Sequence, residues 1–222
     1  MTTRPDSTTR WDDPTWREGT DTPWQVGLRA LQAWWRSEVL ELPPGPFHKS
    51  NPTRLVASNI DFDAPVDANF LTPEAAAAVE ARLAGGSSGL VSEDRLRRML
   101  LSSQPMCFNG FGHFQAPDQR SALLAWVRHL APEAIEVARI EVERAPPPAD
   151  HFGGGSAFDA FIEYRRGDGR LGFLGVECKY HEDLRRSDVK KVRDTYRTFT
   201  ASSGSWHDGA AERLDRPGTR QF

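Results

Sequence analysis

The sequence predicts an α+β domain in which an antiparallel meander of three strands is flanked by helices. Apolar residues recur with helical spacing through the first part of the chain, and then alternate with polar residues from Ile135 to Tyr180. Two turn signals divide this alternating stretch: a proline and glycine run within residues 146–155, and the triplet at residues 167–169. Helices followed by consecutive strands and a last helix are typical of an α+β fold rather than of alternating α/β units.

Composition and charge narrow the class of protein. The 222 residues are 27% charged and 38% hydrophobic, which is the balance of an ordinary globular protein. No apolar run approaches the roughly 18 residues of a membrane span, and Met1–Thr20 lacks the apolar core of a secretory signal. The net charge of −3 argues against indiscriminate coating of nucleic acid but is compatible with a local basic surface.

The cysteine count bounds both the chemistry and the compartment. Cys107 and Cys178 are the only two cysteines of the chain. Two cysteines cannot build a disulfide scaffold or a cysteine-rich zinc site, and they favour a reducing, cytoplasmic compartment.

We expect four parts along the chain: a disordered leader over residues 1–20, a helical extension over 21–91, a core domain over 92–200 and a polar tail over 201–222. Helices are expected where a capping residue, a proline or an apolar stripe marks a start. They begin near Thr22, Thr72, Ser92, Gln119 and Ser187. Residues 102–112 fit neither the helical period nor the strand period.

Three strands are expected over Ile135–Arg144, Phe158–Arg165 and Leu171–Tyr180. Because side chains on a strand alternate between its two faces, Glu177 and Lys179 share one face of the third strand, about 7 Å apart. Whether Asp159 on the second strand reaches the same face depends on the turn between the two strands.

A three-residue loop over residues 167–169 would pair Arg166 with Arg170 and place Asp159 opposite Glu177. A two-residue loop would send the two acids to opposite faces. Gly169 suits the left-handed third position of the longer loop, but Asp-Gly is also a good two-residue turn. We predict the three-residue register because it gathers the charged groups on one patch.

Two carboxylates and an ammonium on one patch are the groups of a divalent-metal site. Like charges this close are unfavourable unless a cation offsets them. Mg²⁺, or Mn²⁺ in its place, binds one or two carboxylates together with waters and phosphate oxygens, and lowers the pKa of a bound water. Asp159 and Glu177 are the expected metal ligands, with the backbone carbonyl of Cys178 as a further oxygen. Lys179 is expected to orient the attacking water.

Asp159, a gap of 17 residues and then Glu177-Cys178-Lys179 resemble the D…(D/E)-x-K signature of the PD-(D/E)XK nuclease superfamily. In that superfamily the aspartate opens the second core strand and the E-x-K motif lies on the third. The resemblance covers residues 92–200 and implies a restriction-endonuclease-like core. It also implies metal-dependent hydrolysis of phosphodiester bonds by an endonuclease, with DNA as the expected partner.

The strings at residues 103–109, 156–160 and 175–180 also resemble a restriction-endonuclease-like subgroup of unassigned role, as does Glu143 at the end of the first strand. Glu143 is either a further metal-site acid or a surface glutamate.

The last helix carries a basic stripe that would either contact a phosphate backbone or be a solvated face. Its members are Arg186, Lys190, Arg193 and Arg197. The superfamily core adds a fourth strand after this helix. We expect that strand to be missing, and the chain to be truncated, because residues 201–222 carry no strand pattern.

Several functions fit the sequence. The leading hypothesis is a metal-dependent endonuclease. The first alternative is a catalytically inactive nuclease-like fold that binds nucleic acid or a protein. The second is a hydrolase that acts on sugars with a carboxylate pair, and it would need neither a metal nor Lys179. A solvated cross-strand ion pair would also produce a Glu-x-Lys pattern on a strand.

Overall fold

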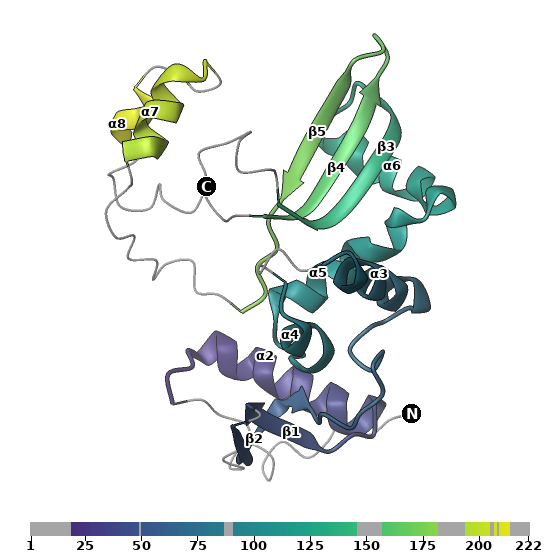
Figure 1. The fold of residues 1–222 in the computed structure, drawn as a ribbon, viewed down its shortest axis with the longest axis vertical. Helices are drawn as coiled ribbons and strands as arrows, with labels where there is room; N and C mark the ends of the chain where they lie inside the picture. Colours follow the sequence, from purple (N-terminus) through teal and green to yellow (C-terminus); the bar gives the residue numbers. More distant parts are fainter. Residues whose placement is uncertain are drawn as a thin grey trace. The chain divides into compact units, whose positions relative to one another are not determined.

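A computed structural model describes residues 19–48, 50–86, 91–145, 157–181, 194–204, 207 and 209–213 of the chain (Figure 1). The chain divides into two compact units, one of residues 1–144 with 157–181 and one of residues 145–156 with 182–222. Residues 1–18 of the expected leader lie outside the described residues, as do residues 214–222 of the tail, where we expect the fourth strand to be missing.

The described part of the first unit combines helices with two antiparallel sheets, which confirms the α+β class. The smaller sheet is a hairpin of β1 (Pro44–His48) and β2 (Asn51–Ile60). The larger sheet is the predicted meander, in the order β3 (Ala134–Arg144), β4 (Phe158–Arg166) and β5 (Leu171–Val176).

The helices of the first unit precede the meander. They are α2 (Pro23–Trp34), which continues as the π-helical turn η2 (Trp35–Val39), α3 (Pro73–Ala84), α4 (Glu93–Arg98), α5 (Ser103–Phe111), the 3₁₀ turns η3 (Gly112–Gln115) and η4 (Pro117–Gln119), and α6 (Arg120–Leu130). The described helices of the second unit are α7 (Asp194–Ser202) and α8 (Ala210–Arg213). Over the described residues, none of these helices has both the length and the apolar character needed to cross a bilayer.

Three of the expected helix starts are confirmed by their caps. The Thr22 side chain accepts a hydrogen bond from the backbone N–H of Gln25, and the Gln25 side chain accepts one from the Thr22 backbone in return. Thr72 caps α3 and Ser92 caps α4 through the same kind of side-chain bond. These caps satisfy backbone N–H groups that have no partner within the first turn of a helix, so the sequence signal has a direct physical cause.

Helix α5 and strand β2 went unpredicted because their burial hides the usual periodicity. Helix α5 occupies the stretch that fits neither period, and Gln104, Pro105, Cys107 and Phe108 are all buried. A helix packed on several sides has no polar face and therefore no helical stripe. Strand β2 is exposed over its first five residues and buried over its last five, so apolar and polar residues do not alternate along it.

The predicted register of the β4–β5 hairpin is confirmed. The Arg166 N–H donates to the Arg170 carbonyl at 2.8 Å, which closes a three-residue loop over residues 167–169. Gly169 has a φ of +82°, the left-handed conformation that this loop requires. The pairs continue without a bulge from Arg165 opposite Leu171 to Ala160 opposite Val176.

Strand β5 is shorter than predicted. It ends at Val176 rather than at Tyr180, so Glu177, Cys178 and Lys179 follow the strand instead of lying within it. The cause is a change of hydrogen-bond partner, because the Cys178 N–H donates to the Asp159 side chain at 2.5 Å. The carboxylate thus replaces the backbone carbonyl that would have continued the ladder.

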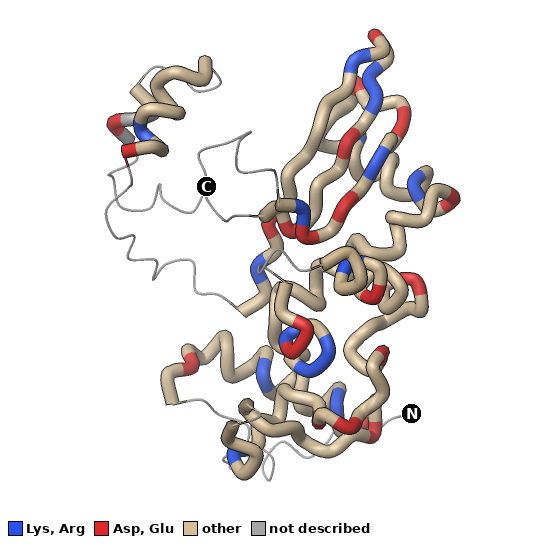
Figure 2. Tube along the Cα trace, in the orientation of Figure 1, with Lys and Arg blue, Asp and Glu red and all other residues tan. Residues whose placement is uncertain are grey.

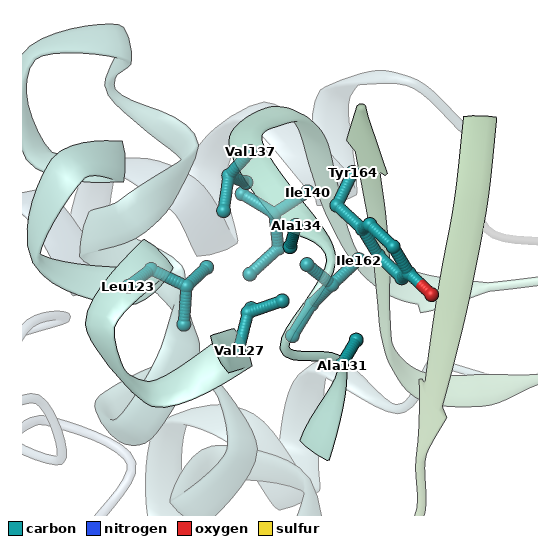
Figure 3. Packing of buried hydrophobic residues seen from close by; sticks show 8 residues of the cluster. All are labelled: Leu123, Val127, Ala131, Ala134, Val137, Ile140, Ile162 and Tyr164. Carbon is teal, nitrogen blue, oxygen red and sulfur yellow. The ribbon is translucent and has the colours of Figure 1, made fainter. Parts of the chain in front are cut away.

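One hydrophobic cluster lies between α6 and the larger sheet (Figure 3). Leu123 and Val127 of α6 point toward Ile140 of β3 and Ile162 of β4. A second cluster connects the helices to the opposite end of the sheet, and Phe108 of α5, fully buried, is its largest member. Its other buried members are Val79, Val91, Leu96, Cys107, Val142 and Ala160. This second cluster fixes α5 against the first residues of β4, where Asp159 lies.

Candidate active site

Asp159 connects two elements of the fold. It is the second residue of β4 and is half-buried. Its backbone oxygen accepts a hydrogen bond from the Cys107 thiol of α5 at 3.0 Å. Its side-chain Oδ2 accepts the bond from the Cys178 N–H. One residue therefore holds α5 on one side and the Glu177-Cys178-Lys179 segment on the other.

Glu177 and Lys179 lie on the exposed side of this segment. Their side chains form an ion pair with each other, and 55% of the Glu177 side chain and 38% of the Lys179 side chain are exposed. The ion pair means that the two side chains point the same way, as the alternation of the chain predicts. The side chain of Cys178, between them, packs instead on the second hydrophobic cluster.

Helix α2 holds the residues that follow the motif. The Gln25 side chain donates to the His181 carbonyl at 3.0 Å, and the Gln32 side chain donates to the hydroxyl of Tyr180. These bonds join positions more than 140 residues apart in the sequence. The segment with Glu177 and Lys179 is thus supported at one end by Asp159 and at the other by α2.

Glu143 is buried, with 5% of its surface exposed, so the alternative of a surface glutamate is wrong. Its φ of +55° turns the side chain inward directly after the buried Val142. Burial raises the pKa of the Glu143 carboxyl to about 7, and the negative charges of Asp159 and Glu177 act in the same direction. A non-glycine residue with positive φ is strained, and strain of this kind is concentrated at functional sites.

Two side chains partly offset the cost of burying Glu143. Gln104 makes a side-chain hydrogen bond to its carboxyl group, and the positive charge of Arg82 favours the ionised form. The Arg82 side chain also donates to the Glu143 carbonyl at 3.3 Å. Gln104 in turn accepts a hydrogen bond from the Ser92 N–H at 3.1 Å. Arg82 was not among the predicted site residues, because an arginine near the end of a helix looks like an ordinary solvated base.

The two cysteines, 71 positions apart in the sequence, meet beside these acids. Cys178 packs on the hydrophobic cluster that contains Cys107, and the interaction between the two thiols lowers the pKa of Cys178 and raises that of Cys107. Both are free thiols, and Cys107 is fully buried. Their proximity went unpredicted because it depends on the packing of α5 against the sheet.

Charges of both signs surround the end of the larger sheet (Figure 2). On its open face Arg139 pairs with Glu141 at 2.9 Å, and Arg144 lies 3.9 Å from the centre of the Phe161 ring. Arg144 was not predicted as a site residue. Among the residues that the structure describes, its buried Nη1 atom has no hydrogen-bond partner, and Arg144 pairs across the sheet with Phe158, the neighbour of Asp159.

The predicted basic stripe belongs to the second unit and is described only in part. Arg186, Lys190 and Arg193 lie outside the described residues. Arg197 lies on α7 and is half-buried. A contact of this stripe with phosphate therefore stays a prediction.

The order of the strands, the hairpin register and the charged residues at the end of the sheet define a nuclease-like α+β core. A family model described as the PD-(D/E)XK nuclease superfamily matches residues 19–222. The chain belongs to the PD-(D/E)XK nuclease superfamily. No curated protein and no solved structure matches the chain significantly.

Nucleases of this superfamily generally use divalent metals, and the donor atoms at the site fit such an ion in kind. Within the described ranges, no group of three or more His, Cys, Asp and Glu side chains is placed to hold an ion by itself. Mg²⁺ needs fewer, because it binds one or two carboxylates and completes its shell with water and phosphate oxygens. Asp159 and Glu177 are carboxylates that would suit such an ion, and a cation would offset the repulsion between their negative charges and Glu143.

Proposed function

We propose that the chain is a metal-dependent endonuclease that hydrolyses phosphodiester bonds in DNA, with Asp159, Glu177 and Lys179 as its active-site residues. One observation carries the proposal: the Asp159 carboxylate lies 2.5 Å from the backbone nitrogen of Cys178, the residue between Glu177 and Lys179. This bond brings residue 159 next to residues 177–179 at the end of the larger sheet, which supports the proposal. A solvated ion pair alone would not account for the buried Glu143 beside them.

Asp159 and Glu177 are the residues that would hold Mg²⁺ or Mn²⁺, and the carbonyl of Cys178 would add a third oxygen. Such an ion would lower the pKa of a water and neutralise charge on the scissile phosphate. Asp159 is held by its hydrogen bond to Cys178, which fixes one carboxylate in place. Glu177 is exposed and pairs with Lys179, so it can turn toward a ligand without disturbing the core.

Lys179 would orient the attacking water or stabilise charge that develops on the phosphate. Its ammonium is a flexible group with three donors, and more than a third of the side chain is exposed. The ion pair with Glu177 keeps this ammonium next to the carboxylate in the absence of substrate. Glu143, with Gln104 and Arg82 around it, would complete the negative charge that attracts the ion.

A plasmid-nicking assay tests the proposal. The full chain is incubated with supercoiled DNA and Mg²⁺, Mn²⁺ or a chelator, and nicked and linear products are followed with time. We expect cleavage with either metal and none with the chelator. Asp159→Asn and Lys179→Met should each lower the rate by about 10²-fold or more, which is typical of lost metal or proton-transfer groups.

Glu163→Gln is the matched control. Glu163 lies on the same open face of β4 and pairs with Arg139 at 3.7 Å, but it is four residues away from Asp159 along the strand, or two repeats of the pleat. Its substitution should leave cleavage within about twofold, because exposed ion pairs contribute little. DNA binding without cleavage under any metal would instead favour the inactive, nuclease-like binding module.

A further inference from the structure

Both cysteines form a hydrogen bond to the same residue, Asp159. The Cys107 thiol donates to the backbone oxygen of Asp159 at 3.0 Å, and the Cys178 N–H donates to the Asp159 carboxylate at 2.5 Å. Cys178 also packs on the hydrophobic cluster that contains Cys107, and the two thiols interact with each other. Asp159 therefore holds Cys107 of helix α5 near Cys178 of the E-x-K segment, although the two segments are far apart in the sequence.

The surroundings of the two sulfurs differ. Cys107 is fully buried in the second hydrophobic cluster, between Phe108, Val142 and Ala160. Cys178 packs on the edge of that cluster and is half-buried. A small oxidant can therefore reach Cys178 first, whereas Cys107 lies next to it in the buried part of the cluster. A partly accessible thiol with a second thiol beside it is the arrangement in which a disulfide forms in preference to overoxidation.

We propose that Cys107 and Cys178 form a reversible intramolecular disulfide when the chain meets a hydroperoxide, which makes Cys178 a redox modification site inside the E-x-K motif. The chain has no other cysteine, so no other internal disulfide competes with this one.

The chemistry balances with hydrogen peroxide as the oxidant. The Cys178 sulfur attacks one peroxide oxygen, the O–O bond breaks, and one water leaves, so that Cys178 becomes a sulfenic acid. The Cys107 sulfur then attacks the Cys178 sulfur, the S–O bond breaks, and the leaving hydroxide takes the Cys107 proton as a second water. Two thiols are oxidised by two electrons in total, and one peroxide is reduced to two waters.

The disulfide would change the site in two ways. The Cys107 proton is lost, so the hydrogen bond to the Asp159 oxygen is lost with it. The sulfur of Cys178 becomes fixed to α5, and the flanking Glu177 and Lys179 lose freedom to turn toward a ligand. The expected loss of activity rests on the proposed function, whereas the disulfide itself does not.

Peptide mapping tests the disulfide without any variant. The full chain is treated with a small excess of hydrogen peroxide, its remaining thiols are alkylated, and it is digested with trypsin. Cleavage after Arg98, Arg120, Arg170 and Lys179 separates the two cysteines. We expect peptides 99–120 and 171–179 to appear linked, and dithiothreitol to release both. Intermolecular bridges, sulfinic acid on Cys178 with a free Cys107, or two unreacted thiols would each overturn the proposal.

Cys107→Ser provides the matched variant. Serine keeps a donor for the Asp159 oxygen but cannot form the second bond. In this variant the sulfenic acid on Cys178 should persist and be trapped by dimedone. Absence of any trapped sulfenic acid in a chain that melts like the wild type would contradict the order of attack.

DNA cleavage gives the second readout. Peroxide should lower cleavage by the wild type by about 10²-fold, as a displacement near 1 Å does in an active site, and dithiothreitol should restore it. Full cleavage by a chain with the mapped disulfide would overturn the effect on the motif. A reduced chain that cleaves no DNA would refute the proposed function instead, and the peptide map would still decide the disulfide.

Discussion

At the scale of single residues, Asp159 has two separable roles. Its carboxylate is both an acceptor for the Cys178 N–H and a proposed metal ligand. Its backbone oxygen is bound by Cys107 whatever the side chain is. The structural role depends on having an oxygen at the side-chain position, and the catalytic role depends on its negative charge.

Two substitutions at Asp159 separate these roles. Asp159→Asn keeps an oxygen acceptor for the Cys178 N–H, so it should lower the free energy of unfolding by less than Asp159→Ala does. Asp159→Ala leaves the N–H without its partner and should cost about 1–2 kcal/mol more, measured by chemical denaturation. Both variants should lose cleavage. Equal stability of the two variants would mean that the Cys178 bond contributes nothing to the fold.

Glu143 predicts a pH dependence of stability. Its pKa is about 7 in the folded chain, against 4.5 for an ordinary glutamate, so the folded state binds the extra proton. Protonation of Glu143 therefore stabilises the folded chain. This stabilisation is fully present below about pH 4.5 and is lost as the pH rises through about 7. The effect has an upper bound of about 3–4 kcal/mol, since the pKa differs by about 2.5 units and one pKa unit corresponds to about 1.4 kcal/mol.

Glu143→Gln removes the titrating group and keeps the shape. The free energy of unfolding, measured in urea without divalent metal, should decrease between pH 5 and pH 7.5 by less in this variant than in the wild type. The difference between the two decreases should be about 3 kcal/mol at most. Parallel pH profiles of the two chains would contradict the assignment of this proton to Glu143.

At the scale of elements, the loop between β4 and β5 decides whether there is a site at all. A one-residue change in register would move Asp159 to the other face of the sheet. The three-residue loop depends on Gly169, whose φ is +82°. A Cβ at Gly169 would meet no atom within 4 Å, so any penalty there comes from backbone conformation and not from a clash.

Gly169→Ala should therefore lower the free energy of unfolding by about 1–2 kcal/mol, the usual cost of placing an L side chain in the left-handed region. Gly167→Ala is the matched control, because Gly167 belongs to the same loop, has no positive φ and leaves room for a Cβ. Thermal and urea unfolding of both variants measure the difference. Equal losses at the two positions would show that the left-handed conformation is not what the loop requires.

At the scale of the whole first unit, the site depends on parts from both ends of the sequence. Helix α2 holds Tyr180 and His181, α5 holds Asp159, and α3 supplies Arg82. A cation that binds the folded chain should therefore stabilise the unit as a whole. A ligand present at 100 times its dissociation constant adds about 2.7 kcal/mol to the free energy of unfolding.

Mg²⁺ or Mn²⁺ should raise the melting temperature of the wild type in a concentration-dependent way, and a chelator should reverse the rise. Glu177→Gln should remove most of the shift, because it takes one of the two proposed carboxylate ligands. Glu163→Gln should retain it. A shift of the same size in all three chains would indicate ions bound elsewhere on the surface.

The sequence by itself determined what depends on local physics. Caps at Thr22, Thr72 and Ser92 set the starts of three helices, and alternation set the three strands of the meander. It also supplied the spacing between Asp159 and the E-x-K motif. Local sequence allowed two registers for the hairpin, and the chemical argument that the charges should gather selected the one that the fold has.

The tertiary structure decided what depends on contacts between distant segments. Whether Glu143 is buried, where β5 ends and which residue lies beside Cys178 are set by contacts with residues of α3, α5 and β4. Burial on several sides removes the periodicity by which α5 could have been recognised, and the change from an exposed half to a buried half removes it for β2. The physical reason is the same throughout: a pattern along the chain records which face of an element meets water, but not which other element covers the opposite face.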